Sequence, residues 1–390
     1  MYVNVAVLKE TQEHERRVAL VPSVVPHLVK LGARLHMQSG AGDASSFTPD
    51  TFKDVVFIDD INHLVAQADV VLSVQPPAIE IVNAMQEGSI LISFIYAERQ
   101  PDLVKCLLEK KITCFAMERI PRISRAQAMD ALSSQSALAG YYAVELGATY
   151  LTRVLPKITT AAGAIGPAKV LVMGLGVAGL EAVATAQRLG AVVEGYDVRP
   201  DTKAEALSLG ATFVDTGVDA SGKGGYARAL TEEEKSKVTA ALTKHIQHAD
   251  LIVTTAAIPG KASPKLINKA QVAGMKHGSV IVDLSAEGGG NCEDSQPGKT
   301  VRIGQVTIAA PLNVPSLLSQ DASELYAHNI YNLLTLMLKD NIIKVDWTDE
   351  VLAGTALTND GKMCEAPPAK APAKPAPSTD QTAKPAAKVA

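Results

Sequence analysis

Residues 169–186 read KVLVMGLGVAGLEAVATA, and this stretch decides the expected fold. The apolar run Lys169–Met173 predicts a strand, and the Ala-rich run after the last glycine predicts a helix. Between them, Gly174, Gly176 and Gly179 form a G-x-G-x-x-G pattern. In a dinucleotide-binding turn the first glycine permits the tight turn, the second lets the backbone approach a pyrophosphate, and the third lets helix and strand pack closely. The stretch therefore predicts a Rossmann-like domain with a phosphate site at the helix N-terminus.

A carboxylate is expected at the end of the next strand, and Asp197 stands there, 18 residues beyond Gly179. It can accept hydrogen bonds from an adenosine ribose diol and would repel a 2′-phosphate, which favours NAD(H) over NADP(H). Arg199 is the contrary sign, because an arginine near this place can accommodate that phosphate. The alternative is a turn of the same shape that binds no nucleotide.

Strand-like runs alternate with helix-like runs along the chain, which predicts βαβ units and parallel sheets. Before residue 134, the expected strands are Val3–Leu8, Ala33–Gln38, Val70–Val74, Ile90–Phe94 and Ile112–Ala116. After residue 134, they are Lys169–Met173, Val192–Tyr196, Leu251–Thr255, Ser279–Leu284 and Val306–Ala309. The expected fold class is α/β, with two Rossmann-like doubly wound parallel-sheet domains separated by a cleft.

The pattern also suggests how the domains divide the chain. The first domain is expected to comprise residues 1–133 and a returning segment of about 319–365, because a helix-like stretch follows residue 319. Residues 134–318 form the expected NAD(H)-binding domain. Residues 366–390 hold nine Ala, six Pro and four Lys, so a disordered, semi-extended tail is predicted. Such a tail is either a tether or a dispensable end.

Composition and motif searches exclude several classes of function. The formal net charge is −4, with no basic excess that would indicate nucleic-acid binding. None of the four cysteines forms a CxxC pair and no HExxH occurs, so neither a metal site nor a disulfide framework is predicted. The longest apolar runs, such as Ile90–Tyr96, are far shorter than the ~20 residues of a membrane span. Cys292 is open to two interpretations, a nucleophile or a small buried thiol.

Two further segments are candidates for the site. Residues 282–291 read VDLSAEGGGN, in which a strand runs into three glycines; this is either a loop near the nicotinamide or a plain flexible turn. Residues 121–136 read PRISRAQAMDALSSQS, in which charged, amide and hydroxyl side chains crowd one segment at the domain boundary. This second segment could place polar groups over the nicotinamide, or it could be a solvated capping loop.

The segment PRISRAQAMDALSSQS, with ERRVALVP, GLGVAGLEAVATAQRLGA, TTAAIPGKASPKLI, GSVIVDLSAEGGGNC and NVPS, resembles the family of alanine dehydrogenases and proton-translocating NAD(P) transhydrogenases. The similarity is greatest to the soluble, NAD(H)-binding first section of the transhydrogenase α subunit and runs from about residue 3 to 365. It implies that hydride passes between NADH and NADP⁺ held on a partner component, while a membrane-spanning component couples the step to proton translocation. It further implies a homodimer in the cytoplasm, peripheral to the bacterial inner membrane.

The resemblance assigns roles to individual residues, and none of them is a metal ligand. Residues matched to holding and aligning the nicotinamide and its ribose, the catalytic set, are Arg122, Gln127, Asp130 and Ser133. Residues matched to other contacts with NAD(H) are Ile123, Ser124, Arg125, Gly174, Gly176, Val177, Ala178, Gly179, Asp197, Val198, Arg199 and Ala257. Gly225 and Tyr226 match a mobile loop that closes over the nucleotide.

Two alternatives to the transhydrogenase component stay open. A soluble alanine dehydrogenase needs a Lys and a His for its keto-acid substrate, but Gln75 and Tyr96 stand at the matching positions and supply no cation near neutral pH. Arg17, which matches a family arginine, is present but cannot carry catalysis alone. A non-catalytic NAD-binding module is the other alternative; in such a protein we would expect a damaged RISRAQ loop, and here the loop is intact.

Overall fold

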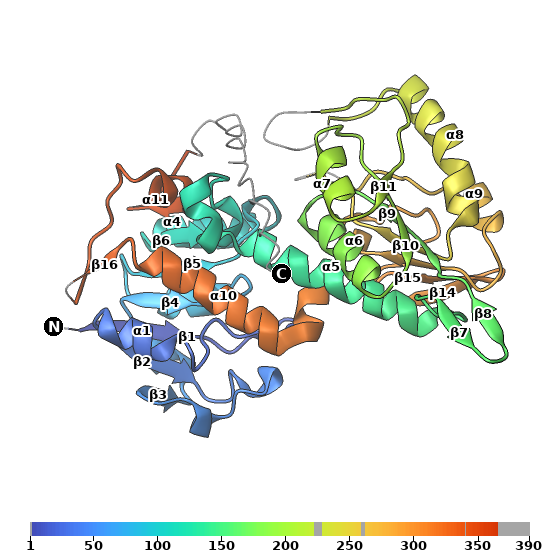
Figure 1. Ribbon diagram of the computed structural model, residues 1–390. Coiled ribbons are helices and arrows are strands. Elements are labelled where there is room, and N and C mark those ends of the chain that lie inside the picture. The colour runs from blue at the N-terminus through green and yellow to red at the C-terminus, as the bar shows by residue number, and fades with distance from the viewer. Residues whose placement is uncertain (1, 222–227, 259–261, 340, 366–390) are drawn as a thin grey trace, which may run out of the picture.

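The computed structural model describes residues 2–221, 228–258, 262–339 and 341–365, which form two α/β lobes (Figure 1). The 20-residue helix α5 (Ala131–Tyr150) runs from one lobe into the other (Figure 1). It contacts α10 (Ser319–Leu334) of the first lobe and packs along α6 (Val177–Arg188) of the second. The boundary expected between residues 133 and 134 falls within α5.

The first lobe is built on an eight-stranded sheet of order β19-β18-β6-β5-β4-β1-β2-β3. From β3 to β6 all pairs are parallel, in the doubly wound order 3-2-1-4-5-6. The parallel strands are β1 (Val3–Val7), β2 (Ala33–Gln38), β3 (Val55–Ile58), β4 (Val70–Leu72), β5 (Ile90–Ser93) and β6 (Thr113–Ala116). Two strands from the end of the chain, β18 (Ala356–Asn359) and β19 (Lys362–Met363), extend the sheet antiparallel beside β6.

Helices cover both faces of this sheet because its strands are apolar on both sides. Val5 and Val7 of β1 belong to one buried cluster, whereas Ala6 belongs to the other, as the two-residue period of a strand requires. The helices on the first face are α1 (Val25–Lys30), α10 and α11 (Glu350–Thr355). The helices on the second face are α2 (Ile61–Ala66), α3 (Ile79–Ala84) and α4 (Pro101–Glu109).

The second lobe repeats the same topology in a seven-stranded sheet of order β11-β10-β9-β12-β13-β15-β14. Its parallel strands are β9 (Lys169–Met173), β10 (Val192–Tyr196), β11 (Thr212–Phe213), β12 (Leu251–Thr254), β13 (Val280–Asp283) and β15 (Val306–Ala309), and β14 (Thr300–Ile303) is antiparallel. The remaining helices are α7 (Thr202–Ser208), α8 (Glu232–His248) and α9 (Lys269–Ala273). The predicted α/β class with two doubly wound parallel sheets is therefore confirmed.

The elements that the sequence pattern missed are short or exposed. They are the edge strands β3, β11 and β14, the added strands β18 and β19, and the hairpin of β7 (Ile158–Thr160) and β8 (Gly163–Ile165). Every residue of β7 and β8 is exposed, so the hairpin carries no inward-facing apolar pattern to detect. Among the helices of the described residues, none combines the length and apolarity needed to cross a membrane.

Candidate nucleotide-binding site

A cleft with a volume of about 2000 Å³ lies between the two lobes. Loops that follow β5 and β6 of the first lobe form one wall, and loops that follow β9, β10, β12 and β13 of the second lobe form the other. These are the carboxyl ends of parallel strands, where ligands of doubly wound sheets bind. The architecture therefore places one long cleft against the ligand-binding edges of two sheets.

The glycine turn after β9 lies on the second-lobe wall. Gly174 has φ +96° and its carbonyl accepts a hydrogen bond from Thr255 Oγ1 at 2.9 Å, which ties the turn to the end of β12. A Cβ at Gly179 would lie 1.8 Å from the Gly174 carbonyl oxygen, so the first turn of α6 packs too closely for a side chain. A Cβ at Gly176, in contrast, would meet no described atom within 4 Å. The turn is thus tight beneath and open toward the cleft.

The N-terminus of α6 faces this open space. Gly176 is the N-cap, and among the described side chains none caps the helix. Val177 and Ala178 line the cleft. Backbone N–H groups left without helical partners, together with the helix dipole, form a site for an anion such as a pyrophosphate. Helix α5 supports the turn from behind, where a Cβ at Gly140 would lie 2.0 Å from the Ala178 carbonyl oxygen.

Asp197 follows β10 and stands beside the glycine turn. Its Oδ2 accepts a hydrogen bond from the backbone N–H of Leu175 at 2.7 Å. Arg199 donates to the same carboxylate through Nε at 2.8 Å and through Nη2 at 2.7 Å. These hydrogen bonds to the carboxylate are the main cause that raises the pKa of the Arg199 guanidinium. Asp197, Val198 and Arg199 all line the cleft.

The first-lobe wall carries the loop that precedes α5. Residues Ser124–Met129 form a 3-10 helix, and Asp130 is the N-cap of α5. The Asp130 carboxylate accepts from the Ser133 backbone N–H at 3.0 Å and from the Ser133 hydroxyl at 2.6 Å. Arg125 points elsewhere: its guanidinium donates to the Asp349 carboxylate at 2.6 and 3.0 Å, which fastens the loop to the N-cap of α11.

Most of the residues singled out from the sequence meet in this cleft. Those that line it are Arg122, Ile123, Ser124, Gln127, Asp130, Ser133, Gly174, Gly176, Val177, Ala178, Asp197, Val198, Arg199 and Ala257. Gly179 and Arg125 are not among the described lining residues; the first is buried beneath the turn and the second is held by Asp349. Gly225 and Tyr226 lie outside the described residues.

The structure adds cleft residues that sequence reasoning did not assign to the site. Glu118, after β6, accepts hydrogen bonds from the backbone N–H groups of Ile95 at 3.1 Å and Tyr96 at 2.6 Å, and burial raises its pKa. Tyr96, after β5, lies in the cleft at φ +51°. Both follow buried parallel strands, so polar residues at predicted strand ends were the signal that could have found them.

The glycine-rich loop after β13 is held from below by a buried carboxylate. Asp283 accepts from the backbone N–H groups of Ser285 at 3.0 Å and Asn291 at 2.8 Å. Asn291 in turn accepts from the Ala256 backbone N–H at 3.0 Å and so fixes the segment that contains Ala257. The neighbouring Cys292 is buried, and burial raises its pKa to about 11, so it is a thiol at neutral pH. Within residues 2–221, 228–258, 262–339 and 341–365, no cluster of His, Cys, Asp and Glu is arranged to hold a metal ion.

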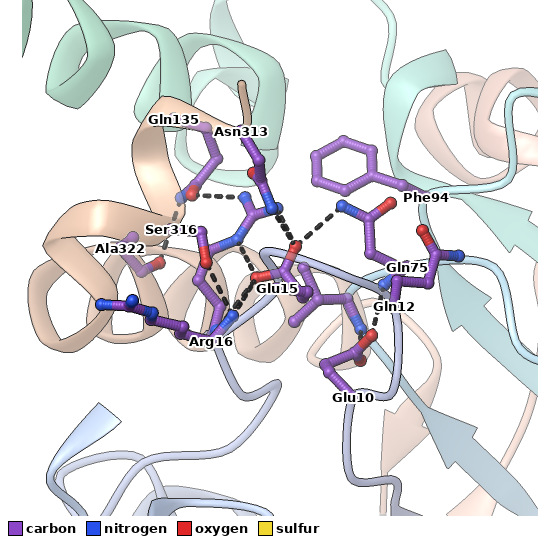
Figure 2. A network of polar contacts seen from close by, with 12 residues as sticks. Glu10, Gln12, Glu15, Arg16, Gln75, Phe94, Gln135, Asn313, Ser316 and Ala322 are labelled. Carbon is purple, nitrogen blue, oxygen red and sulfur yellow. Dashed lines mark hydrogen bonds and ion pairs between the residues drawn. The ribbon is translucent and has the colours of Figure 1, made fainter. Parts of the chain in front are cut away.

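The matching edge of the first lobe holds an internal ion pair instead of an open turn. Arg17, 4% exposed, donates through Nη2 to Glu15 at 2.6 Å. Figure 2 shows Glu15 at the centre of a network, with Gln75 donating at 2.8 Å and Asn313 at 2.9 Å. Burial alone would raise the pKa of Glu15, but the bonds from Arg17 outweigh it and hold the pKa at about 2.

Comparison with known proteins identifies the family. A model of the N-terminal domain of alanine dehydrogenase/PNT matches residues 6–139, and a model of the C-terminal domain matches residues 143–366. The chain belongs to the alanine dehydrogenase/PNT family. The predicted family is thus confirmed, and the boundary between the two matched models falls within α5.

Within the alanine dehydrogenase/PNT family, the chain is similar to transhydrogenase subunits. It is 44% identical to the first of the separately encoded parts of the NAD(P) transhydrogenase α subunit of Rhodospirillum rubrum, over 93% of this chain and 97% of that protein. A solved transhydrogenase structure from Sinorhizobium meliloti matches with a TM-score of 0.80 and 36% identity, over 92% of this chain and 98% of the other. An L-alanine dehydrogenase structure matches with a TM-score of 0.75 and 22% identity, over 93% and 96% of the two chains, and supports the fold alone.

Proposed function

We propose that this chain is the NAD(H)-binding component of a proton-translocating transhydrogenase, which passes hydride between NADH and NADP⁺ bound on a partner component. The observation that carries the proposal is the placement of the open α6 N-terminus and Asp197 across one cleft from Gln127, Asp130 and Ser133. One wall suits the adenosine and pyrophosphate of a dinucleotide, and the other offers polar groups to its nicotinamide end. The 44% identity to a transhydrogenase subunit supports the same activity.

In this proposal the nucleotide supplies the hydride, and the protein holds it in place. The backbone N–H groups that begin α6 bind the pyrophosphate, and Asp197 accepts hydrogen bonds from the adenosine ribose. Gln127, Asp130 and Ser133 orient the nicotinamide and its ribose from the opposite wall. Holding donor and acceptor in a reactive geometry and excluding water lowers the barrier without an acid or base from this chain.

The polar network of the first lobe weighs against an alanine dehydrogenase. Nε, Nη1 and Nη2 of Arg17 all donate within the chain, to Glu15, Gln135 and Asn313. A keto-acid carboxylate would therefore have to displace a buried partner of this arginine. Gln75 is bonded to Glu15, and burial raises the pKa of Tyr96, so neither supplies a cation.

The proposal includes partners and location. We infer a complex with an NADP(H)-binding component and a membrane-spanning component, at the cytoplasmic side of the bacterial inner membrane. We also infer a homodimer, for which the exposed β7–β8 hairpin, with Ile158 and Ile165 on its surface, is the candidate contact. The division into residues 1–133 with 319–365, and 134–318, is included in the same proposal.

A reconstitution experiment tests this function. The purified chain is titrated with NADH and NADPH, and hydride transfer is then measured with a purified NADP(H)-binding transhydrogenase component added. We expect selective NADH binding, and transfer only with that component present. Reduction of pyruvate with ammonium by the chain alone would instead establish an alanine dehydrogenase. NADH binding without transfer, under conditions where a known NAD(H)-binding component is active, would indicate a binding module.

A further inference from the structure

Arg199 is held at the adenosine-ribose end of the cleft in a way that bears on nucleotide choice. Four donors converge on the Asp197 carboxylate: the backbone N–H groups of Leu175 and Arg199, and the Nε and Nη2 groups of Arg199. Their distances to the carboxylate oxygens run from 2.7 to 2.9 Å. Two backbone N–H groups and a bidentate guanidinium are the donors that a phosphate requires. In this chain an internal carboxylate fills that set of donors.

The surrounding charge adds to the effect of Asp197. After the hydrogen bonds with Asp197, the charges of Glu205 and Asp201 also raise the pKa of Arg199. Asp201 and Glu205 both line the cleft beside Asp197. One guanidinium therefore faces three carboxylates, and the end of the cleft is net negative. A phosphate monoester carries a charge of about −2 near neutral pH and is repelled there.

We propose that Arg199, with the Leu175 backbone N–H, is a latent 2′-phosphate site that Asp197 occupies in place of a ligand, so that this ion pair decides between NAD(H) and NADP(H). The inference rests on the proposed function, since it concerns the adenosine end of the same nucleotide. It also resolves the conflict in the sequence between Asp197, which favours NAD(H), and Arg199, which suits NADP(H). The arginine is present, but its fork is already bonded to a carboxylate.

The site makes a distinct prediction for two replacements of Asp197. Asp197→Ser removes the carboxylate and leaves space among the four donors, so a 2′-phosphate can take its place. Asp197→Asn removes the charge but keeps the side chain in that space. We therefore expect a larger gain in affinity for 2′-phosphorylated nucleotides with Ser than with Asn. If loss of negative charge alone mattered, the two variants would gain equally.

The test measures the adenosine end separately from the nicotinamide, by titration calorimetry with 5′-AMP and adenosine 2′,5′-bisphosphate, and then with NADH and NADPH. For Asp197→Ser we expect the affinity for the bisphosphate to rise about tenfold, and that for NADH to fall about tenfold. Adding Arg199→Gln should abolish the gain. Asp215→Ser is the matched control: this exposed carboxylate pairs with Lys203 at 3.7 Å on the same lobe and is not among the described cleft-lining residues.

Three outcomes would overturn the inference: no gain in Asp197→Ser, an equal gain in Asp197→Asn, or a gain that persists without the guanidinium of Arg199. If Asp197→Ser melts too low to be measured, Glu205→Gln leaves the clamp intact and should raise bisphosphate affinity by a smaller factor, with 5′-AMP affinity unchanged; no rise there would also count against it. Absence of NADH binding by the unaltered chain would overturn the proposed function itself, whatever the variants do.

Discussion

The two lobes share one strand order but differ at the same point of their topology. In the second lobe the loop after the first strand, β9, is a glycine turn that leaves the α6 N-terminus open to the cleft. In the first lobe the loop after the first strand, β1, carries Glu10 and leads to Glu15 and Arg17, which bond to the end of β4 and to one another. The topology supplies a ligand-binding edge twice, and the local residues decide whether it is open or filled.

The largest expected effect is on the filled edge. Arg17→Met removes the partner of a buried carboxylate, and we expect the free energy of unfolding to fall by about 4 kcal/mol, because Glu15 then stays buried and unpaired. The double variant Glu15→Gln with Arg17→Met should be less destabilised than Arg17→Met alone. Denaturant unfolding measures both. If NADH affinity of the folded variant fell as much as stability, the two edges would not be independent.

The pH dependence of stability separates the two glutamates of the first lobe. Burial raises the pKa of Glu10 to about 8, so its contribution to stability is complete below about pH 4.5 and is lost as pH rises through 8. Glu15, with its pKa held at about 2, contributes above about pH 4.5 and loses that contribution as pH falls toward 2.

Glu10→Gln should therefore remove the alkaline decline. We expect the stability of this variant relative to the unaltered chain to increase by about 3 kcal/mol between pH 6 and pH 9, because only the glutamate loses its proton in that interval. Urea unfolding at pH 6, 7.5 and 9 measures the difference, with Glu13→Gln, an exposed neighbour, as control. Parallel pH profiles for Glu10→Gln and the unaltered chain would show that Glu10 does not titrate in this range.

In the open edge, two of the three glycines should respond in opposite ways. Gly179→Ala places a Cβ against the Gly174 carbonyl oxygen, and we expect a loss of about 2 kcal/mol in stability from overpacking. Gly176→Ala meets no described atom, so stability should change little while NADH affinity falls, because the Cβ lies where the pyrophosphate binds. Thermal unfolding and NADH titration compare the two variants. Equal loss of stability in both would contradict the assigned roles.

The smallest expected free-energy effect is at Asp130. Asp130→Asn keeps a good N-cap residue, so stability and NADH binding should hardly change. Hydride transfer to the NADP(H)-binding partner should slow about tenfold, because the nicotinamide is aligned less well. Single-turnover transfer rates measure this effect. An unchanged rate would remove Asp130 from the alignment of the nicotinamide and leave it as a helix cap.

The sequence by itself determined the features that depend on neighbours along the chain. The buried parallel strands are apolar runs, so β1 and β9 were readable, whereas half-exposed edge strands such as β14 were not. The glycine turn was readable because its geometry depends on residues within six positions of one another. The carboxylate at the end of β10 was readable because it directly follows an apolar strand.

Only the tertiary structure decided which groups face the cleft and which are already bonded. Arg125 sits in the loop predicted to contact the nucleotide, yet Asp349, from the far end of the chain, directs its guanidinium away. Arg17 was recognised as a family arginine, but its partner Asn313 comes from the segment that returns to the first lobe. Hydrogen bonds between residues hundreds of positions apart depend on the packing of whole elements, which no local pattern encodes.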